Sequence, residues 1–118
     1  MIDFREEKNF KKYDDGDIIF EQGDEGTFMY AVVQGEVEMR VGDKFVTSVR
    51  ENEFFGEMAV LDNEPRSATA HAIESTTLAV ITKDRFLEML RQDHDFSLQI
   101  IRVLINRLRA ETKMKQFW

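Results

Sequence analysis

Apolar residues recur in short runs along the first part of the chain and with a helical period along the last part. The short runs are rich in β-branched and aromatic side chains and are bounded by turns that contain glycine, a pattern typical of β-strands. They fall at residues 17–21, 28–33, 36–41, 44–49, 67–73 and 77–81. Their regular spacing predicts about seven or eight short strands in a closed or two-sheet antiparallel architecture. The glycines expected to act there simply as turn formers are Gly16, Gly23, Gly26, Gly35 and Gly42.

The clearest strand is the alternating segment 36–41. Val37, Met39 and Val41 are expected to face the core, with the charged residues between them on the outer face. Gly42-Asp43 follows and has the composition of a two-residue hairpin loop with glycine first. The next strand, 44–49, should therefore pair with this one.

Two helices are expected to end the chain. Thr82 is placed to cap the first helix, and Asp84 lies near its positive end. The apolar contacts of this helix come from Phe86, Leu87 and Leu90. By contrast, residues 1–15 are charged and irregular, and are expected to form a short helix or a draped arm.

The last helix is expected to run from near Asp95 to about Lys115 and to carry two apolar stripes. One stripe comprises Leu98, Ile101, Ile105, Leu108 and Thr112, and the other comprises Phe96, Ile100, Val103 and Met114. A helix that lies on one surface needs a single stripe. This helix is therefore expected to face both its own barrel and a second partner.

Composition narrows the functional class. A chain of 118 residues is expected to be one domain, with little room for a sensor and a separate output domain. Its 16 basic and 23 acidic residues give a net charge of −7, which argues against a general nucleic-acid or anionic-membrane binder. No apolar run reaches the roughly 18 residues of a membrane span, no signal peptide is evident, and cysteine is absent. We therefore expect a soluble, cytoplasmic protein that holds any anion locally.

The residues best suited to binding an anion lie in the segment 55–69. Gly56 opens what reads as a one-turn helix, whose first amide hydrogens lack intrahelical acceptors and favour an anion. Pro65 stiffens the backbone before Arg66, whose planar guanidinium suits two phosphate oxygens, and Ser67 adds a hydroxyl.

Glu57 lies inside this cationic segment, where its carboxylate would repel a bound phosphate unless it has a separate role. Accepting hydrogen bonds from a sugar hydroxyl is one such role. Taken alone, Glu57 and Arg66 would more simply form a surface ion pair of little value. The glycine, the proline and the run of small residues around them favour the binding interpretation.

The runs Phe-Gly-Glu-Met-Ala and Pro-Arg-Ser-Ala-Thr resemble the phosphate-binding cassette of the cyclic nucleotide-binding domains. This family includes the catabolite activator protein, the regulatory subunits of cAMP-dependent protein kinase and cyclic-nucleotide-gated channels. The resemblance extends from about Gly16 to the last helix. It implies a mainly β fold with flanking helices, a double-stranded β-helix or jelly-roll barrel with C-terminal B and C helices. The implied parts are a helical arm (1–15), a barrel with its cassette (16–82) and the hinge with lid or dimerisation helices (83–118).

The resemblance also implies a ligand, cAMP or cGMP, and the residues that would bind it. The cyclic phosphate would be bound by Gly56, Met58, Ala59, Arg66 and Ser67, and the ribose 2′-hydroxyl by Glu57. The sugar and base would be lined by Met39, Val46 and Thr47 and, on the last helix, by Arg107 and Thr112. Relatives that prefer guanine often carry threonine after the cassette arginine. Ser67 therefore favours cAMP and leaves cGMP open.

Three further expectations concern mechanism and alternatives. Tightening of the cassette would draw the hinge and last helix over the ligand, and that movement would be the signal. The main alternative is a non-binding member of the fold that acts as a protein-interaction module.

An enzymatic function is less favoured than either the receptor or the interaction module. No metal cluster or positioned base accompanies the cassette, and neither His71 nor His94 is expected to act as a base or metal ligand. We expect no catalytic residue, metal, cofactor or helix-turn-helix DNA reader; a homodimer through the last helix is favoured, and the downstream protein partner stays open.

Overall fold

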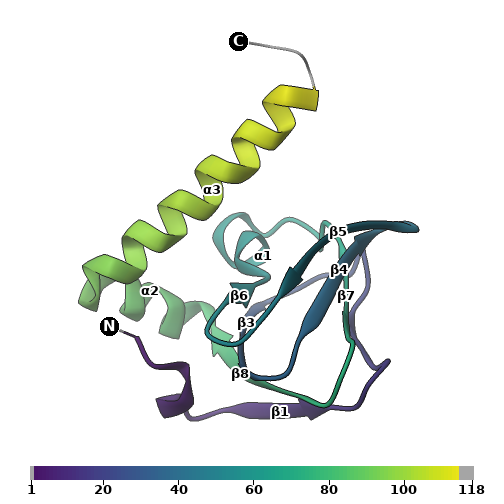
Figure 1. Ribbon diagram of the computed structural model, residues 1–118. Helices are drawn as coiled ribbons and strands as arrows, with labels where there is room; N and C mark the ends of the chain where they lie inside the picture. The colour runs from purple at the N-terminus through teal and green to yellow at the C-terminus, as the bar shows by residue number, and fades with distance from the viewer. Residues whose placement is uncertain (1, 115–118) are drawn as a thin grey trace. The chain divides into compact units, whose positions relative to one another are not determined.

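The computed structural model describes residues 2–114, with the side chains of residues 2–106, 108 and 109 (Figure 1). Its helices are η1 (Phe4–Glu6), α1 (Glu57–Asp62), α2 (Lys83–Gln92) and α3 (His94–Met114). Its strands are β1 (Phe10–Tyr13), β2 (Ile18–Phe20), β3 (Phe28–Gln34), β4 (Val37–Val41), β5 (Lys44–Val49), β6 (Phe54–Phe55), β7 (Thr69–Ala72) and β8 (Thr76–Thr82). The chain divides into two compact units, one spanning Asp3–Phe86 and one containing Ile2 and the residues from Leu87 onward.

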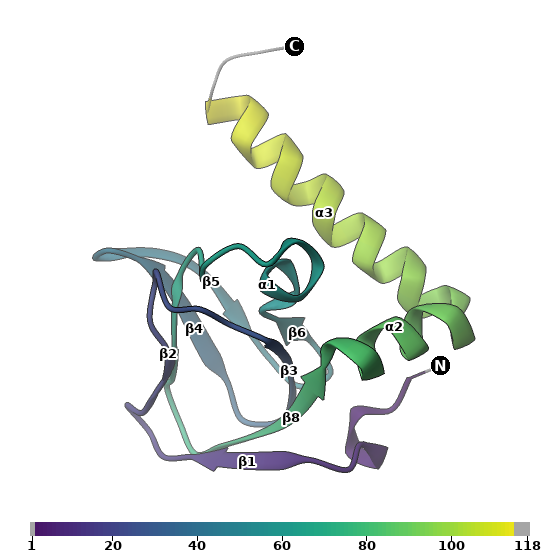
Figure 2. The ribbon, with the colours of Figure 1, turned by 180° about the vertical axis from the view of Figure 1, so that it is seen from behind.

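The strands of the first unit form two antiparallel sheets of four strands each. Their orders are β1-β8-β3-β6 and β2-β7-β4-β5, so each sheet combines strands from distant parts of the chain (Figure 2). Such sharing of strands between two sheets is typical of jelly-roll folds. The predicted mainly β architecture with C-terminal helices is confirmed.

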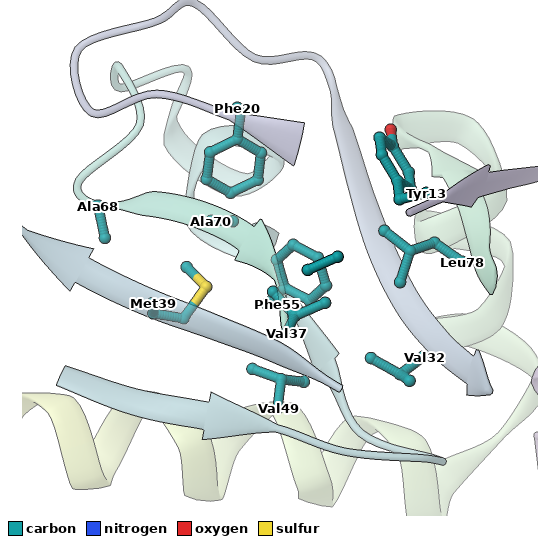
Figure 3. Close-up of a cluster of buried hydrophobic side chains, with 11 residues drawn as sticks. Tyr13, Phe20, Val32, Val37, Met39, Val49, Phe55, Ala68, Ala70 and Leu78 are labelled. Carbon is teal, nitrogen blue, oxygen red and sulfur yellow. The ribbon is translucent and has the colours of Figure 1, made fainter. Parts of the chain in front are cut away.

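Side chains from both sheets meet in one apolar core (Figure 3). Three aromatic rings lie together in it or against it, with centroid distances of 6.1 Å for Phe20–Tyr30, 5.8 Å for Phe20–Phe55 and 5.4 Å for Tyr30–Phe55. Phe55 ends β6 directly before Gly56. The ring cluster therefore lies at the entrance to the cassette. The remaining buried members are Tyr13, Val32, Val37, Met39, Val49, Ala68, Ala70, Ala72 and Leu78.

The β4–β5 hairpin confirms most of the predicted alternation. Val37 and Met39 are buried, and Gly42 in the two-residue turn has a positive φ of 59°. Val41 was predicted to be buried, and this is wrong because its side chain is 42% exposed. It ends β4 next to the turn, where the hairpin extends past the core.

A bulge interrupts the same hairpin. Met39 pairs with Thr47, whereas the next residue, Arg40, pairs with Phe45. Val46 is thus an extra residue in β5, and a bulge of this kind bends and twists its strand. The sequence pattern gave no sign of it.

The N-terminal region contains a short helix, which was one of the two expectations, and also a strand that was not expected. After the short η1, the chain enters β1, which pairs with β8 at the edge of a sheet. Glu7 lies between η1 and β1 and accepts two hydrogen bonds from Arg85, with Nε–Oε1 and Nη2–Oε2 distances of 2.8 and 2.9 Å. This bidentate pair fastens the N-terminal segment to the first turn of α2.

Each C-terminal helix has a side-chain cap. The Thr82 hydroxyl accepts a hydrogen bond from the Arg85 amide at 3.1 Å, as predicted for the start of α2. The Asp93 carboxylate accepts one from the Phe96 amide at 3.0 Å, which caps α3 and lowers the pKa of Asp93.

The two predicted stripes of α3 have different environments. Phe96 and Ile100 of one stripe are buried, whereas the described members of the other stripe are exposed: Leu98, Ile101, Ile105 and Leu108. The side chains of Thr112 and Met114 lie outside the described residues. Within the range that the structure describes, no helix is long and apolar enough to cross a membrane.

Candidate functional site

The site begins at the N-terminus of α1. Gly56 occupies the N-cap position with φ 82° and ψ 9°, a left-handed conformation that glycine adopts without steric cost. An added Cβ would lie 2.8 Å from Nη1 of Arg66, so the residue must also lack a side chain. Gly56 therefore both turns the chain into α1 and admits the arginine.

Backbone hydrogen bonds fix the position of Arg66. Its amide donates to the carbonyl of Asp24 at 2.7 Å, and its carbonyl accepts from the amide of Gly23 at 2.8 Å. The loop after β2 thus holds the cassette arginine by both of its backbone groups. Asp24 and Gly23 lie 42 and 43 positions before Arg66, and next to them the Gln22 amide donates to the Thr69 hydroxyl at 2.9 Å.

The Arg66 side chain is buried, with 5% of its surface exposed. Nη1 donates to the Gly56 carbonyl at 3.1 Å, and Nη2 donates to the Phe28 carbonyl at 2.7 Å. Nε is also buried and has no hydrogen-bond partner among the described residues. Burial lowers the pKa of Arg66, while Tyr30, Asp24 and Glu57 act electrostatically in the opposite direction.

Aromatic rings line one side of this arginine. Its Cζ lies 4.1 Å from the ring centroid of Phe20 and 5.8 Å from that of Tyr30. Both distances are within the range of a cation–π interaction. Burial raises the pKa of Tyr30, so its hydroxyl remains neutral around pH 7.

Gly26 approaches the same guanidinium. A Cβ at this position would collide with Nε and Cζ and would lie 2.6 Å from Nη2 of Arg66. Gly16, Gly23, Gly35 and Gly42 have positive φ, as expected of turn formers, but Gly26 does not. The interpretation of Gly26 as a simple turn glycine is therefore wrong, because close approach of Arg66 is what requires it.

The other predicted phosphate and ribose residues surround α1. Glu57 is fully buried, and its charge acts on Arg66, which brings the carboxylate and guanidinium into one site. Ala59 is buried and Met58 half-buried on the same helix, whereas Ser67 is exposed beside the arginine.

The predicted wall of the sugar and base is only partly described. Met39 is buried at 9% exposure and belongs to the core, while its cross-strand partner Thr47 is exposed. Val46 is 53% exposed and is the bulged residue of β5, between Phe45 and Thr47. The side chains of Arg107 and Thr112 lie outside the described residues.

The two histidines, His71 and His94, lie outside the segment 55–69. Among the described residues no group of three or more histidine, aspartate or glutamate side chains could hold a metal ion. His71 is half-buried with Nε2 3.8 Å from Oε1 of Glu38, which also accepts a hydrogen bond from Arg40. His94 is exposed at the start of α3.

The sequence analysis singled out residues 55–69 and missed the residues that hold Arg66 in place. Phe20 reads as an ordinary strand residue and Gly26 as an ordinary turn residue. The Gly56 and Phe28 carbonyls carry no sequence signal at all. The sequence did contain one indication: Gly23 and Gly26 lie within four residues, and a single turn does not need two glycines.

A family model described as cyclic nucleotide-binding domain matches residues 10–93. The regulatory subunit of cAMP-dependent protein kinase of Debaryomyces hansenii is 40% identical over 75 residues, which cover 64% of this chain and 17% of that protein. Rap guanine nucleotide exchange factor 1 of Caenorhabditis elegans is 34% identical over 93 residues, 75% of this chain and 9% of that protein. The chain thus spans a small part of these curated relatives.

Solved structures show the same fold. The catabolite activator protein of Thermus thermophilus matches with a TM-score of 0.80 and 31% identity, covering 92% of this chain and 54% of that chain. The EAL enzyme Bd1971 in its cAMP-bound form matches with a TM-score of 0.67 and 34% identity, covering 92% of this chain and 30% of that chain. Its cGMP-bound form matches with a TM-score of 0.69 and 35% identity over 90% of this chain and 30% of that chain.

Proposed function

The chain belongs to the cyclic nucleotide-binding domain family, and we propose on that premise that it is a receptor for a cyclic nucleotide that releases its ligand unchanged. The observation that carries the proposal is the state of Arg66. Its guanidinium is buried in an otherwise acidic chain, and its Nε lacks a hydrogen-bond partner among the described residues. A buried guanidinium whose bound acceptors are neutral carbonyls favours an anionic ligand, because such a ligand adds charge to the hydrogen bonds.

A cyclic phosphate provides the required anion. Arg66 can offer it two donors in a planar fork, and the first amides of α1 between Gly56 and Ala59 add neutral donors at the positive end of the helix dipole. The exposed Ser67 hydroxyl lies next in sequence and can donate a further bond. Glu57 would then accept a hydrogen bond from the ribose 2′-hydroxyl.

Binding in this way requires an exchange of partners. Nη1 and Nη2 of Arg66 donate to the carbonyls of Gly56 and Phe28. A phosphate oxygen is charged and a carbonyl oxygen is not, so the exchange replaces bonds in which only the donor is charged with stronger bonds in which both partners are charged. Glu57 becomes reachable only if this part of the cassette opens, because its side chain is fully buried.

We favour cAMP as the ligand and keep cGMP as the second candidate. The residue after Arg66 is serine, as in the activator branch of the family, and Bd1971 has been solved with either nucleotide. A competition titration decides the preference. Displacement of a fluorescent cAMP analogue at lower concentration by cAMP than by cGMP supports it, and the reverse order refutes it.

The signal would pass to the C-terminal helices and, through them, to a second copy of the chain. The exposed residues Leu98, Ile101, Ile105 and Leu108 of α3 follow one another at intervals of three and four positions, the spacing of a coiled-coil seam. Sedimentation equilibrium tests the dimer. A dimer that dissociates in Ile101→Glu supports this role, and a monomer at all concentrations, with and without cAMP, removes it.

A specific observation favours a second candidate, a non-binding domain that acts in protein interaction. The Arg66 donors already have backbone acceptors, and Glu57 is covered. A chain that had lost its ligand could keep both residues as structural elements. Binding assays separate the candidates directly.

Thermal unfolding with cAMP, cGMP and 5′-AMP is the test. At a ligand concentration 100 times Kd, a ligand that binds only the folded state adds about 2.7 kcal/mol, which corresponds to roughly 10 °C for a domain of this size. We expect a shift of this order with a cyclic nucleotide, little with 5′-AMP, and none in Arg66→Ala. Equal melting temperatures with and without all three nucleotides support the interaction domain instead.

A further inference from the structure

Phe20 contacts the flat face of the Arg66 guanidinium. The distance from Cζ to the ring centroid is 4.1 Å, and both side chains are buried, at 8% and 5% exposure. A cation–π contact is stronger where water is excluded. This contact joins β2 to the cassette, and Phe20 lies outside the sequence motif of residues 55–69.

The contact differs in kind from the hydrogen bonds of Arg66. The N–H groups of a guanidinium point outward in its plane, so acceptors bind along its edge. The carbonyls of Gly56 and Phe28 occupy that edge, and a phosphate would compete for the same donors. The Phe20 ring lies against the face and uses no donor, so this contact can persist while the edge partners change.

We propose that Phe20 is a positioning residue that holds the plane of the Arg66 guanidinium while its donors pass from backbone carbonyls to the ligand's phosphate. This role rests on the proposed function. The ring is itself held by Tyr30 and Phe55, at centroid distances of 6.1 and 5.8 Å, so it is a fixed support. Gly26 adds a position without a side chain beside the same guanidinium.

Phe20→Leu tests the role by removing the π face while keeping an apolar side chain. We expect cAMP affinity measured by calorimetry to fall about 3- to 30-fold, the range of a buried cation–π contact. Phe20→Tyr, which keeps the ring, should restore most of it. If Phe20→Leu does not fold, Phe20→Met, whose unbranched and flexible side chain fills irregular gaps, takes its place.

Phe55→Leu is the matched control. Phe55 belongs to the same ring cluster and is 1% exposed, but in the described part of the chain the cation–π contacts of the guanidinium are with Phe20 and Tyr30. Urea unfolding should show that both leucine variants lose stability, while affinity falls more in Phe20→Leu. Equal losses of affinity in the two variants would mean that the cluster acts only through packing, which overturns the proposal.

A second readout is independent of packing. In the nucleotide-free protein, the Arg66 Nε–H proton signal in a ¹H–¹⁵N spectrum should move downfield in Phe20→Leu, because the ring current is lost. In an Arg66→Gln background, Phe20→Leu should cost no further affinity, since Phe20 acts through the guanidinium. Wild-type protein that binds no nucleotide would refute both the receptor function and this role. Wild-type binding with full affinity in Phe20→Leu, or an additive loss in the Arg66→Gln background, would refute the positioning role alone.

Discussion

Gly26→Ala is the substitution whose effect follows most directly from the geometry of the site. The φ angle of Gly26 is outside the left-handed region, so alanine can adopt the backbone conformation. The new Cβ would nevertheless collide with Nε and Cζ of Arg66 and lie 2.6 Å from its Nη2, where real Cβ contacts stay beyond 3.0 Å. The guanidinium must therefore move.

The cost of this movement can be worked out from the contacts of Arg66. Its Nη atoms donate at 3.1 and 2.7 Å to carbonyls, and each such bond from a charged group contributes about 1.5–3 kcal/mol. Displacement that breaks one of them should lower the free energy of unfolding by about 1.5–3 kcal/mol, similar to other cases of overpacking. If the same displaced donor binds the phosphate, cAMP affinity should fall about 10- to 150-fold.

Urea unfolding and calorimetric titration with cAMP measure the two effects. Gly16→Ala is the control, because Gly16 has φ 90° with no atom within 4 Å of an added Cβ. It should lose about 1–2 kcal/mol of stability through backbone strain and keep its affinity. In an Arg66→Ala background, the destabilisation by Gly26→Ala should largely disappear, since the colliding group is gone. Gly26→Ala protein with wild-type stability and affinity would refute the reasoning.

Three further predictions concern the ribose contact and the helix caps. Glu57→Gln should weaken binding of cAMP about 10-fold but leave binding of 2′-deoxy-cAMP nearly unchanged, as measured by calorimetry; an equal loss for both ligands would place Glu57 elsewhere. The lowered pKa of Asp93 means that its contribution to stability is present above its ordinary value of 3.8 and is lost as the pH falls below it. Asp93→Asn should therefore unfold in urea with a weaker pH dependence between about pH 5 and 2, and a profile parallel to wild type would contradict this. Thr82→Ala should lower the free energy of unfolding by about 0.5–2 kcal/mol through loss of the hydroxyl that binds the Arg85 amide, and Thr82→Ser should retain most of it.

The sequence predicted those features that depend on neighbouring residues. The alternation around Val37 and Met39 identified a strand, the Gly42 turn fixed its hairpin, and Thr82 marked the start of a helix. Each of these signals arises within a few positions, where side-chain period and turn chemistry act directly. The same locality made the cassette recognisable.

Features that depend on distant segments escaped prediction. The charged residues before Tyr13 gave no strand pattern, yet β1 forms because β8 offers it a sheet edge. Val41 alternates correctly with its neighbours but lies beyond the core, so its exposure depends on where the opposing sheet ends. Phe20 and Gly26 become site residues only when the loop after β2 binds the backbone of Arg66. The spacing of residue types along the chain does not predict tertiary contacts of this kind.

Calorimetric titration of the wild-type chain with cAMP, and in a parallel run with cGMP, tests the central claim most directly. The arrangement of Arg66, Gly56 and Glu57 predicts saturable heat at one site per chain for at least one of these nucleotides, with 5′-AMP bound far more weakly and with a much lower affinity in Arg66→Gln. Heat that does not exceed dilution for either cyclic nucleotide, or equal binding by Arg66→Gln, would contradict it.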